Sequence, residues 1–307
     1  MAELIEFHQG SPEWLEARRS GITATDAPAL YGVSPWSSPL KVWTEKKARE
    51  EYPFEVTPRM LWGQRLEGPM LDAYIEETKL PATHTHGMFR HEGGLLLASP
   101  DAEVGEAGLV ELKTSQFAED WFEAGAAEPH VPLHVQFQVR HQMLVTDRLW
   151  TDVCILIGGN DFHILPRVWR DEDWDHHHLQ VVPEWWAKYV VGDVEPAAQA
   201  ADESFLKQRY GYEPEKAVEL EEKFAHMLDD WTALGNSMRQ DVARRDDIVA
   251  LFRQALGEAA VGILPDGRRV TRTRIEKHDC RYTKKDPTHE VVVSEQFRLN
   301  KPRQPRR

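Results

Sequence analysis

The chain has 307 residues, 41% of them hydrophobic and 11 of them Trp, so it is long enough to bury a sizeable core. No apolar run reaches about eighteen residues, so no transmembrane helix is expected. Cys154 and Cys280 form no metal-binding spacing, and the N-terminus lacks the pattern of a signal peptide, which together favour a reducing cytoplasm.

The net charge of -14 by itself argues against a nucleic-acid-binding protein, because phosphate contacts need Lys and Arg. The distribution of charge matters more than its sum. Residues 262–307 carry 13 Lys and Arg against 6 Asp and Glu. A basic segment beside an acidic remainder neither indicates nor excludes nucleic acid.

Four helices are expected in the first third of the chain. The first covers 11–19, with Ser11 at the N-cap and Pro12 at N1. A turn at 21–26 leads into a second, short helix. Two longer helices follow over 39–47 and 58–78, the latter with apolar residues close to helical spacing.

Strands and helices alternate in the next part. Strands are expected near 86–90, 95–99, 108–114, 151–158 and 162–168, and helices over 132–144 and 171–189. The run His176-His177-His178 lies in a polar stretch and is interpreted as a solvated helix start, not a metal site. This order predicts an α/β core.

The C-terminal third has a different character. Apolar residues recur at helical spacing over 214–258, interrupted at Gly235-Asn236, which predicts a helical hairpin or a bent coiled-coil arm. A β-hairpin turned at 265–267 is expected next, and the basic residues 300–307 are expected to be disordered. The predicted boundaries are 1–200 for the core, 201–260 for the arm and 261–307 for the basic β segment and tail.

One motif in the core carries chemistry. Ser99-Pro100-Asp101 is followed by Glu111-Leu112-Lys113. Asp101 and Glu111 offer hard oxygen ligands for Mg²⁺, and the Leu112 carbonyl can supply a third. In a strand, Glu111 and Lys113 face the same side, so Lys113 can orient a water beside the metal. An exposed hairpin with charged edges is the alternative, and the apolar run 95–98 together with the glycines at 105 and 108 favours the buried site.

Other segments line up with this motif in a fixed order. They are Trp14 with Arg18, Ile22-Thr23-Ala24-Thr25, Trp62-Gly63-Gln64-Arg65-Leu66-Glu67, the two core triplets, and Gln138-Val139-Arg140-His141-Gln142. Over about 7–190 the chain resembles the lambda-type exonucleases and YqaJ-like viral recombinases, with a restriction-endonuclease-like, PD-(D/E)XK core. The family pattern is usually Gln-x-Gln, where this chain has Arg140, and Ser where it has Thr25.

The resemblance implies a role for each matching residue. Asp101, Glu111 and the Leu112 carbonyl would hold Mg²⁺ or Mn²⁺, with Glu67 contributing directly or through water. Lys113 would be the catalytic lysine, and Gln138 would help to place the nucleophile. Arg18 and Thr25, with Ser99 nearby, would bind a 5′-phosphate, since the Arg fork suits phosphate oxygens. Trp14, Trp62 and Trp121 are expected to be packing residues.

The resemblance further implies a metal-dependent exonuclease that acts on linear double-stranded DNA ends. It would degrade one strand 5′ to 3′ and leave a 3′ single-stranded tail for phage-type recombination. The implied partners are DNA ends, further copies of the chain in a ring-like oligomer, and a single-strand annealing protein, in the cytoplasm of a host of a phage or prophage; no membrane is implied. An endonuclease or repair nuclease on the same core, and a non-catalytic DNA-binding scaffold, are the alternatives.

Overall fold

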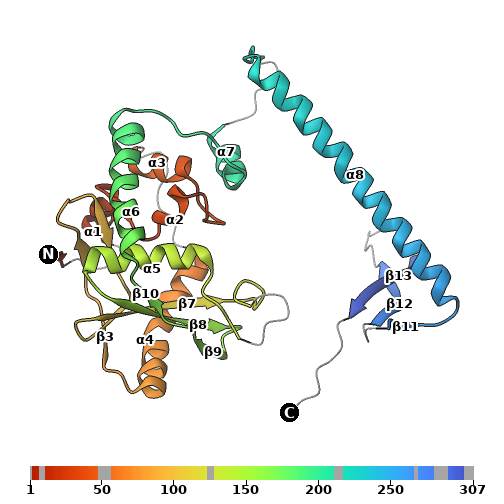
Figure 1. The fold of residues 1–307 in the computed structure, drawn as a ribbon, viewed down its shortest axis with the longest axis horizontal. Coiled ribbons are helices and arrows are strands. Elements are labelled where there is room, and N and C mark those ends of the chain that lie inside the picture. The colour runs from red at the N-terminus through yellow and green to blue at the C-terminus, as the bar shows by residue number, and fades with distance from the viewer. Residues whose placement is uncertain are drawn as a thin grey trace, which may run out of the picture. The chain divides into compact units, whose positions relative to one another are not determined.

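The structure is a computed structural model, and it describes residues 2–6, 11–47, 57–122, 128–210, 217–265, 269–279 and 290–300. The chain divides into two compact units, Met1–Tyr212 and Glu213–Arg307. Figure 1 shows the helices and strands of each unit. Among the described residues, no helix has the length and apolar character needed to span a membrane.

The first unit combines helices with two sheets. Its helices are α1 (Pro12–Arg19), α2 (Ala27–Leu30), α3 (Pro39–Lys47), α4 (Pro58–Thr78), α5 (Leu133–Thr146), α6 (Glu172–Trp185), η1 (Trp186–Val191), η2 (Ala200–Asp202) and α7 (Glu203–Arg209). Its strands are β1 (Glu3–Ile5), β2 (Ile22–Thr23), β3 (Ala82–His84), β4 (Met88–Arg90), β5 (Leu96–Ala98), β6 (Ala102–Val104), β7 (Gly108–Ser115), β8 (Trp150–Ile157), β9 (Asp161–Ile164) and β10 (Val168–Trp169).

The larger sheet has the order β10-β8-β7-β6-β3, with β9 paired to β8, and the smaller has the order β1-β4-β5-β2. Strand β7 lies between antiparallel β6 and parallel β8. A parallel pair needs a crossover connection, and α5 lies within the connection from β7 to β8. This hairpin, crossover helix and parallel strand form the α/β core that the sequence predicts.

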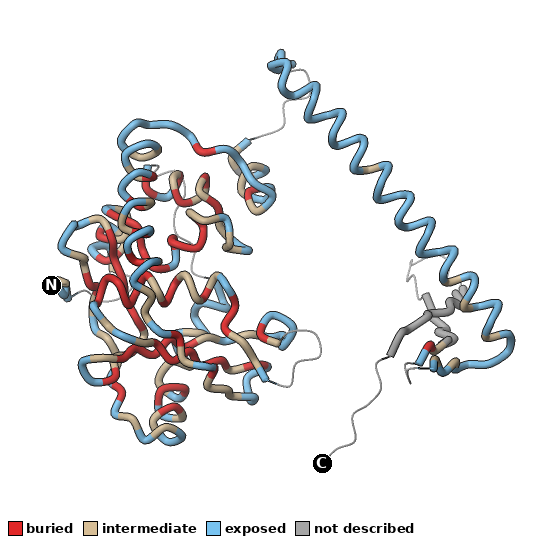
Figure 2. The backbone as a smooth tube through the Cα atoms, viewed as in Figure 1, coloured by how far each residue is buried: buried red, intermediate tan, exposed pale blue. Residues whose placement is uncertain are grey.

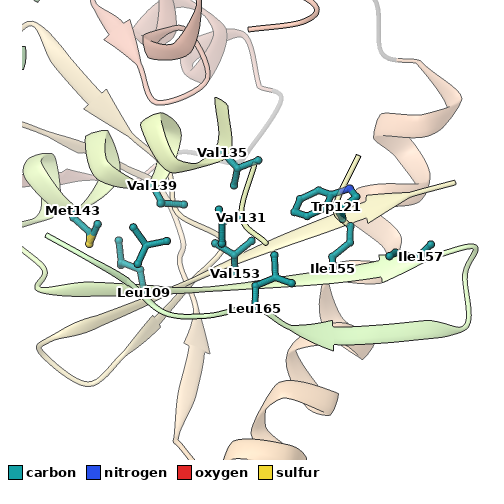
Figure 3. Packing of buried hydrophobic residues seen from close by; sticks show 11 residues of the cluster. Leu109, Trp121, Val131, Val135, Val139, Met143, Val153, Ile155, Ile157 and Leu165 are labelled. Atoms are coloured by element: carbon teal, nitrogen blue, oxygen red, sulfur yellow. The ribbon is translucent and has the colours of Figure 1, made fainter. Parts of the chain in front are cut away.

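A hydrophobic cluster fixes α5 against the central strands, as Figure 3 shows. Val135, Val139 and Met143 of α5 recur at helical spacing and are almost fully buried. They belong to one cluster with Leu109 of β7 and Val153 of β8. Burying a side chain of this size stabilises the fold by roughly 1.5–3 kcal/mol, so the position of α5 on the sheet is strongly determined.

The predicted helices of the first unit are confirmed. Helices α3 and α4 cover the expected 39–47 and 58–78, and the Ser11 hydroxyl accepts from the Trp14 amide at 3.2 Å as an N-cap should. The sequence did not reveal β2, β3 and β6, which have only two or three residues each. Such strands are defined by pairing with distant segments, so a local pattern does not reveal them.

The expectation for the histidine run is wrong at one position. His176 and His177 are exposed, but His178 is fully buried. The His141 Nε2–H donates to the Leu97 carbonyl (3.0 Å), since a carbonyl only accepts, and His141 Nδ1 then accepts from His178 Nε2 (2.8 Å). The Tyr31 hydroxyl donates to His178 Nδ1 at 2.9 Å. Helix α6 turns His178 inward because its apolar face packs on the core.

The second unit contains α8 (Lys223–Leu256) and the strands β11 (Val261–Ile263), β12 (Arg269–Asp279) and β13 (Glu290–Asn300). The predicted helical hairpin is wrong, because α8 is one continuous helix through Gly235-Asn236. A single Gly lowers helix stability by about 1 kcal/mol and does not end a helix of this length. The predicted β-hairpin is present as β11 and β12, which pair antiparallel. Residues 301–307 and the turn at 266–268 lie outside the described residues.

The buried histidines make stability depend on pH. Burial lowers the pKa of His141 to about 4 and that of His178 to about 2, from the usual 6.5. At these two histidines the unfolded chain therefore binds more protons than the folded one below about pH 6.5, so their contribution to the free energy of unfolding falls as pH falls. Urea unfolding of the wild type and a His178 variant, compared from neutral pH to about pH 4, should show this loss.

His178→Phe should destabilise the protein by about 1–3 kcal/mol at neutral pH, since two buried partners lose their hydrogen bonds. Its pH dependence should also be shallower than that of the wild type. His176→Phe, at an exposed position of the same helix, is the control. A His178→Phe variant that loses as much stability on acidification as the wild type would contradict the prediction.

Candidate active site

The site is centred on Glu111, a carboxylate in the middle of β7 that is only 2% exposed. Gln138 Nε2 donates to Glu111 Oε1 at 2.5 Å, and Gln142 Nε2 donates to Glu111 Oε2 at 2.8 Å. The Lys113 ammonium, two residues along the same strand, also donates to Glu111 Oε1. A buried carboxylate is tolerated only when it is paired and hydrogen-bonded, and both oxygens of Glu111 meet this condition.

Asp101 lies directly before β6, in the bend that leads out of β5. Its Oδ2 accepts from the Leu112 amide at 2.7 Å, just before the start of β6, whose first residue Ala102 pairs with Val110. The N–H and C=O of one strand residue face the same neighbour, so the Leu112 carbonyl faces the Asp101 side of β7. The structure thus brings together the three predicted oxygen donors.

Glu67 of α4 is the third carboxylate at this site. Burial raises the pKa of Glu67, the charge of Glu111 raises it further, and Lys113 acts in the opposite direction. Burial likewise raises the pKa of Asp101 well above its usual range, followed by the charge of Glu111. Three carboxylates against one ammonium leave negative charge that a cation can balance.

Lys113 remains an ammonium in this environment. Burial acts to lower the pKa of Lys113, but the charges of Glu111 and Asp101 outweigh it, so the pKa is raised. The side chain keeps 27% of its surface exposed, and it lines the neighbouring cleft. Lys113 therefore presents donor hydrogens to any group that enters that cleft.

The donor set suits a hard divalent cation. Carboxylate and carbonyl oxygens are the ligands of Mg²⁺ and Mn²⁺, and the site supplies them from Asp101, Glu111 and Leu112. In the described part of the chain, no three His, Cys, Asp or Glu side chains already form a metal-binding group. The groups available to a cation here are the carboxylates of Asp101 and Glu111 and the Leu112 carbonyl, with Glu67 nearby.

The predicted phosphate-binding residues also come together. Arg18 Nη2 donates to Thr25 Oγ1 at 3.2 Å. Arg18, Thr25 and Ser99 line one cavity of about 40 Å³, which Gln138 and Gln142 also line. The buried Ser99 Oγ has no hydrogen-bond partner within the described residues, so its hydroxyl is free for a ligand. The pocket and the Glu111 site thus share two glutamines.

A buried ion pair holds the loop that carries Thr25. Lys46 Nζ donates to Asp26 Oδ2 at 2.7 Å and to the Arg18 carbonyl at 2.8 Å, and Asp26 accepts from the Thr23 amide at 2.9 Å. Burial acts to raise the pKa of Asp26, but the charges of Lys46 and Arg18 outweigh it and the pKa is lowered. These contacts tie α1, the 22–26 loop and α3 together behind the pocket.

Two hollows flank the site. Lys113, Gln138 and Thr25 line a cleft of about 1000 Å³, and Glu67, Asp101 and Ser99 line one of about 570 Å³. Trp14 and Trp121 are buried, as expected for packing residues. The same expectation is wrong for Trp62, which is 59% exposed and lines the larger cleft. The periodicity of α4 does not reveal that Trp62 is left largely uncovered by the described residues.

Gln142 is the site residue that sequence reasoning missed. It lies four residues after Gln138, and this spacing places both amides on the face of α5 that meets Glu111. That spacing is the signal that could have found it. Arg140, at the position that departs from the family pattern, instead donates to Asp171 at 2.5 Å. The departure therefore leaves the Glu111 site unchanged.

Comparison with known proteins finds one matching family model and one similar bacterial protein. Residues 13–149 match the family model described as the YqaJ-like viral recombinase domain. The protein YqaJ of Bacillus subtilis (strain 168), whose function is uncharacterized, is 27% identical over 221 residues, which are 68% of this chain. The match spans 66% of that relative, about two thirds of its length.

Solved structures of exonucleases are also similar. An alkaline exonuclease from Laribacter hongkongensis is 20% identical with a TM-score of 0.45, covering 65% of this chain and 97% of that chain. A putative exonuclease from Eubacterium rectale is 11% identical with a TM-score of 0.47, covering 69% and 97%.

The matched range 13–149 spans the acidic residues, the lysine and both glutamines of the site. Residues 13–149 of this chain are therefore similar to the YqaJ-like viral recombinase domain.

Proposed function

We propose that this protein is a divalent-metal-dependent exonuclease that acts on the ends of linear double-stranded DNA. It degrades one strand 5′ to 3′ and leaves a 3′ single-stranded tail for phage-type recombination by strand annealing. The observation that carries the proposal is Glu111, hydrogen-bonded by Gln138, Gln142 and Lys113 beside Asp101 and Glu67. The similarity of residues 13–149 to the YqaJ-like viral recombinase domain supports it.

Asp101, Glu111 and the Leu112 carbonyl would hold Mg²⁺, or Mn²⁺ in its place, with Glu67 beside them. When bound, the cation supplies Lewis-acid activation of water and charge stabilisation at phosphorus. Gln138 and Gln142 hold the two oxygens of Glu111 in place. Lys113 orients the attacking water and stabilises negative charge that develops on the phosphate.

Directionality follows from the pocket beside these residues. Arg18 offers a guanidinium fork, and Thr25 and Ser99 offer hydroxyl donors, which are the groups that bind phosphate. A terminal 5′-phosphate in this pocket would place the first phosphodiester at the Glu111 site. Contacts of this kind position a strand without reading its sequence. The partners we propose are further copies of the chain in a ring-like oligomer and a single-strand annealing protein.

Digestion of DNA with Mg²⁺ tests the activity and the end pocket together. Linear duplexes with 5′-phosphate ends should be degraded faster than those with 5′-hydroxyl ends, and covalently closed circles should be spared. Lys113→Ala should lower the rate on the order of 10²-fold or more. Arg18→Ala should reduce the difference between the two ends. Lys207→Ala, at a side chain that is 72% exposed, is the control.

If closed circles were cleaved, the protein would be an endonuclease or repair nuclease on the same core and not an exonuclease. DNA binding without cleavage in the presence of any divalent metal would favour a non-catalytic scaffold. Duplexes with 5′-phosphate and 5′-hydroxyl ends could be degraded at equal rates while cleavage still requires Lys113. This result would contradict the proposed phosphate pocket but not the nuclease activity.

Gln142→Leu should lower the rate about 10–100-fold, the usual effect of losing a hydrogen bond to a metal-binding carboxylate. The substitution leaves Glu111 Oε2 without its donor from α5. Gln136→Leu on the same helix, where the amide donates to the Val131 carbonyl instead, is the matched control. Steady-state kinetics on linear duplex DNA measure both, and equal rates for the two variants would rule out this role for Gln142.

Asp101→Asn tests metal binding by thermal stability, without a measurement of activity. The pKa of Asp101 is raised in the folded protein above its value in the unfolded chain, which is about 3.9. The contribution of Asp101 to the stability of the metal-free protein is therefore lost as pH rises from about 3.9 through the pKa of the folded state. At neutral pH in EDTA, the variant should therefore melt a few degrees higher than the wild type. Added Mn²⁺ should raise the Tm of the wild type and leave that of the variant unchanged.

Thermal unfolding with and without EDTA measures both effects, with Asp72→Asn at an exposed position of α4 as control. If Mn²⁺ stabilised Asp101→Asn as much as the wild type, Asp101 would not be a ligand.

A further inference from the structure

Helix α8 carries a row of large apolar side chains that nothing in the described residues covers. The helix has 34 residues, and none of them is buried, as Figure 2 also shows. The exposed apolar side chains, from 41% to 72% exposed, are Phe224, Met227, Leu228, Trp231, Leu234, Met238, Val242, Ile248 and Leu251. A contiguous apolar face of this kind marks an interaction surface.

The spacing along α8 is that of a coiled-coil seam, in which apolar residues alternate at steps of three and four. The positions on the seam are Phe224, Met227, Trp231, Leu234, Met238, Asp241, Arg245, Ile248, Phe252 and Ala255. Leu228, Val242, Val249 and Leu256 flank it on one side. A seam of this period fits another helix of the same period.

Two charges interrupt the seam near its middle. Asp241 and Arg245 occupy consecutive seam positions, and within the described part of the chain neither has an ion-pair partner. A partner helix must therefore present a cation opposite Asp241 and an anion opposite Arg245. A second α8 does this in one antiparallel register, in which the Asp241 of each copy lies opposite the Arg245 of the other.

We propose that α8 pairs with the α8 of a second copy of this chain as an antiparallel coiled coil in this register. The register also aligns Met238 with Ile248 and Leu234 with Phe252 across the seam. The large Trp231 lies opposite the small Ala255, so the layers are complementary in volume as well as in charge. Residues 230–256 overlap, which corresponds to about 40 Å of helix.

A parallel pair in register is less favourable. It would place Asp241 against Asp241 and Arg245 against Arg245, and like charges that face each other at a seam oppose association. The antiparallel contact is isologous, since each copy supplies the same residues, and it therefore closes as a pair. This inference concerns the second unit and stands independently of the proposed nuclease function.

Charge reversal in the full-length chain tests the pairing. Asp241→Arg places two cations opposite each other in both halves of the seam, and Arg245→Asp places two anions there. Each single variant should associate at least tenfold more weakly than the wild type, and its mass by light scattering should fall to half. Mixing the two variants should restore the wild-type mass, because each Arg then meets an Asp. Asp229→Arg, outside the seam on the same helix, is the control.

Helix content measured by circular dichroism should be the same in all variants, which excludes unfolding as the cause. Cleavage per chain on a short duplex should also be unchanged, so a failure here is distinct from a failure of the proposed function. Two single variants that keep the wild-type mass would overturn the proposal and assign any assembly to other surfaces. A wild type that is monomeric at high concentration would overturn it as well, and would leave a partner protein or the nuclease unit to cover α8. Loss of association that mixing does not restore would overturn the antiparallel register.

Discussion

The buried carboxylate of Glu111 needs hydrogen-bond partners, and the rest of the candidate active-site structure depends on this constraint. An ionised group in the interior requires partners for both of its oxygens, because leaving water without them is strongly unfavourable. Here α5 supplies two amides and β7 supplies one ammonium. Removing α5 from the sheet would leave Glu111 without most of its partners, so the packing of the helix and the chemistry of the site are linked.

The sheet determines which groups reach this carboxylate. Strand β6 begins only at Ala102, opposite Val110, so the Leu112 amide is free to bond to the Asp101 side chain and not to a strand neighbour. Gly105, with a φ of +55°, lies in the turn that joins β6 to β7. Gly108 starts β7 where a Cβ would approach the Trp150 ring to 2.2 Å, so this close contact requires glycine. The short hairpin thereby brings Asp101 beside the middle of β7.

The same arrangement stores unfavourable electrostatic energy. Burial and mutual repulsion raise the pKa values of Asp101 and Glu67, and Lys113 offsets only part of this repulsion. Perturbed groups that converge in a cleft are characteristic of functional sites, where stability is reduced for the sake of chemistry. Away from the site, the buried charges of Asp26 and Lys46 neutralise each other behind the pocket that Arg18, Thr25 and Ser99 line. The contrast distinguishes the groups that hold the fold from those that act on a ligand.

The sequence by itself determined the local features of this protein. Caps, prolines and helical periodicity predicted α1, α3, α4 and α5, and the spacing from Asp101 to Lys113 predicted which residues meet. It failed where an outcome depends on a distant partner. Examples are the pairing of β3 with β6 and the burial of His178 against His141. The exposure of Trp62 and the continuity of α8 through Gly235 also differ from the prediction. Gln142 became a site residue only once α5 was seen to rest on β7. Local patterns follow from backbone geometry over one or two turns, whereas burial and hydrogen-bond partners depend on which segments the tertiary structure brings together.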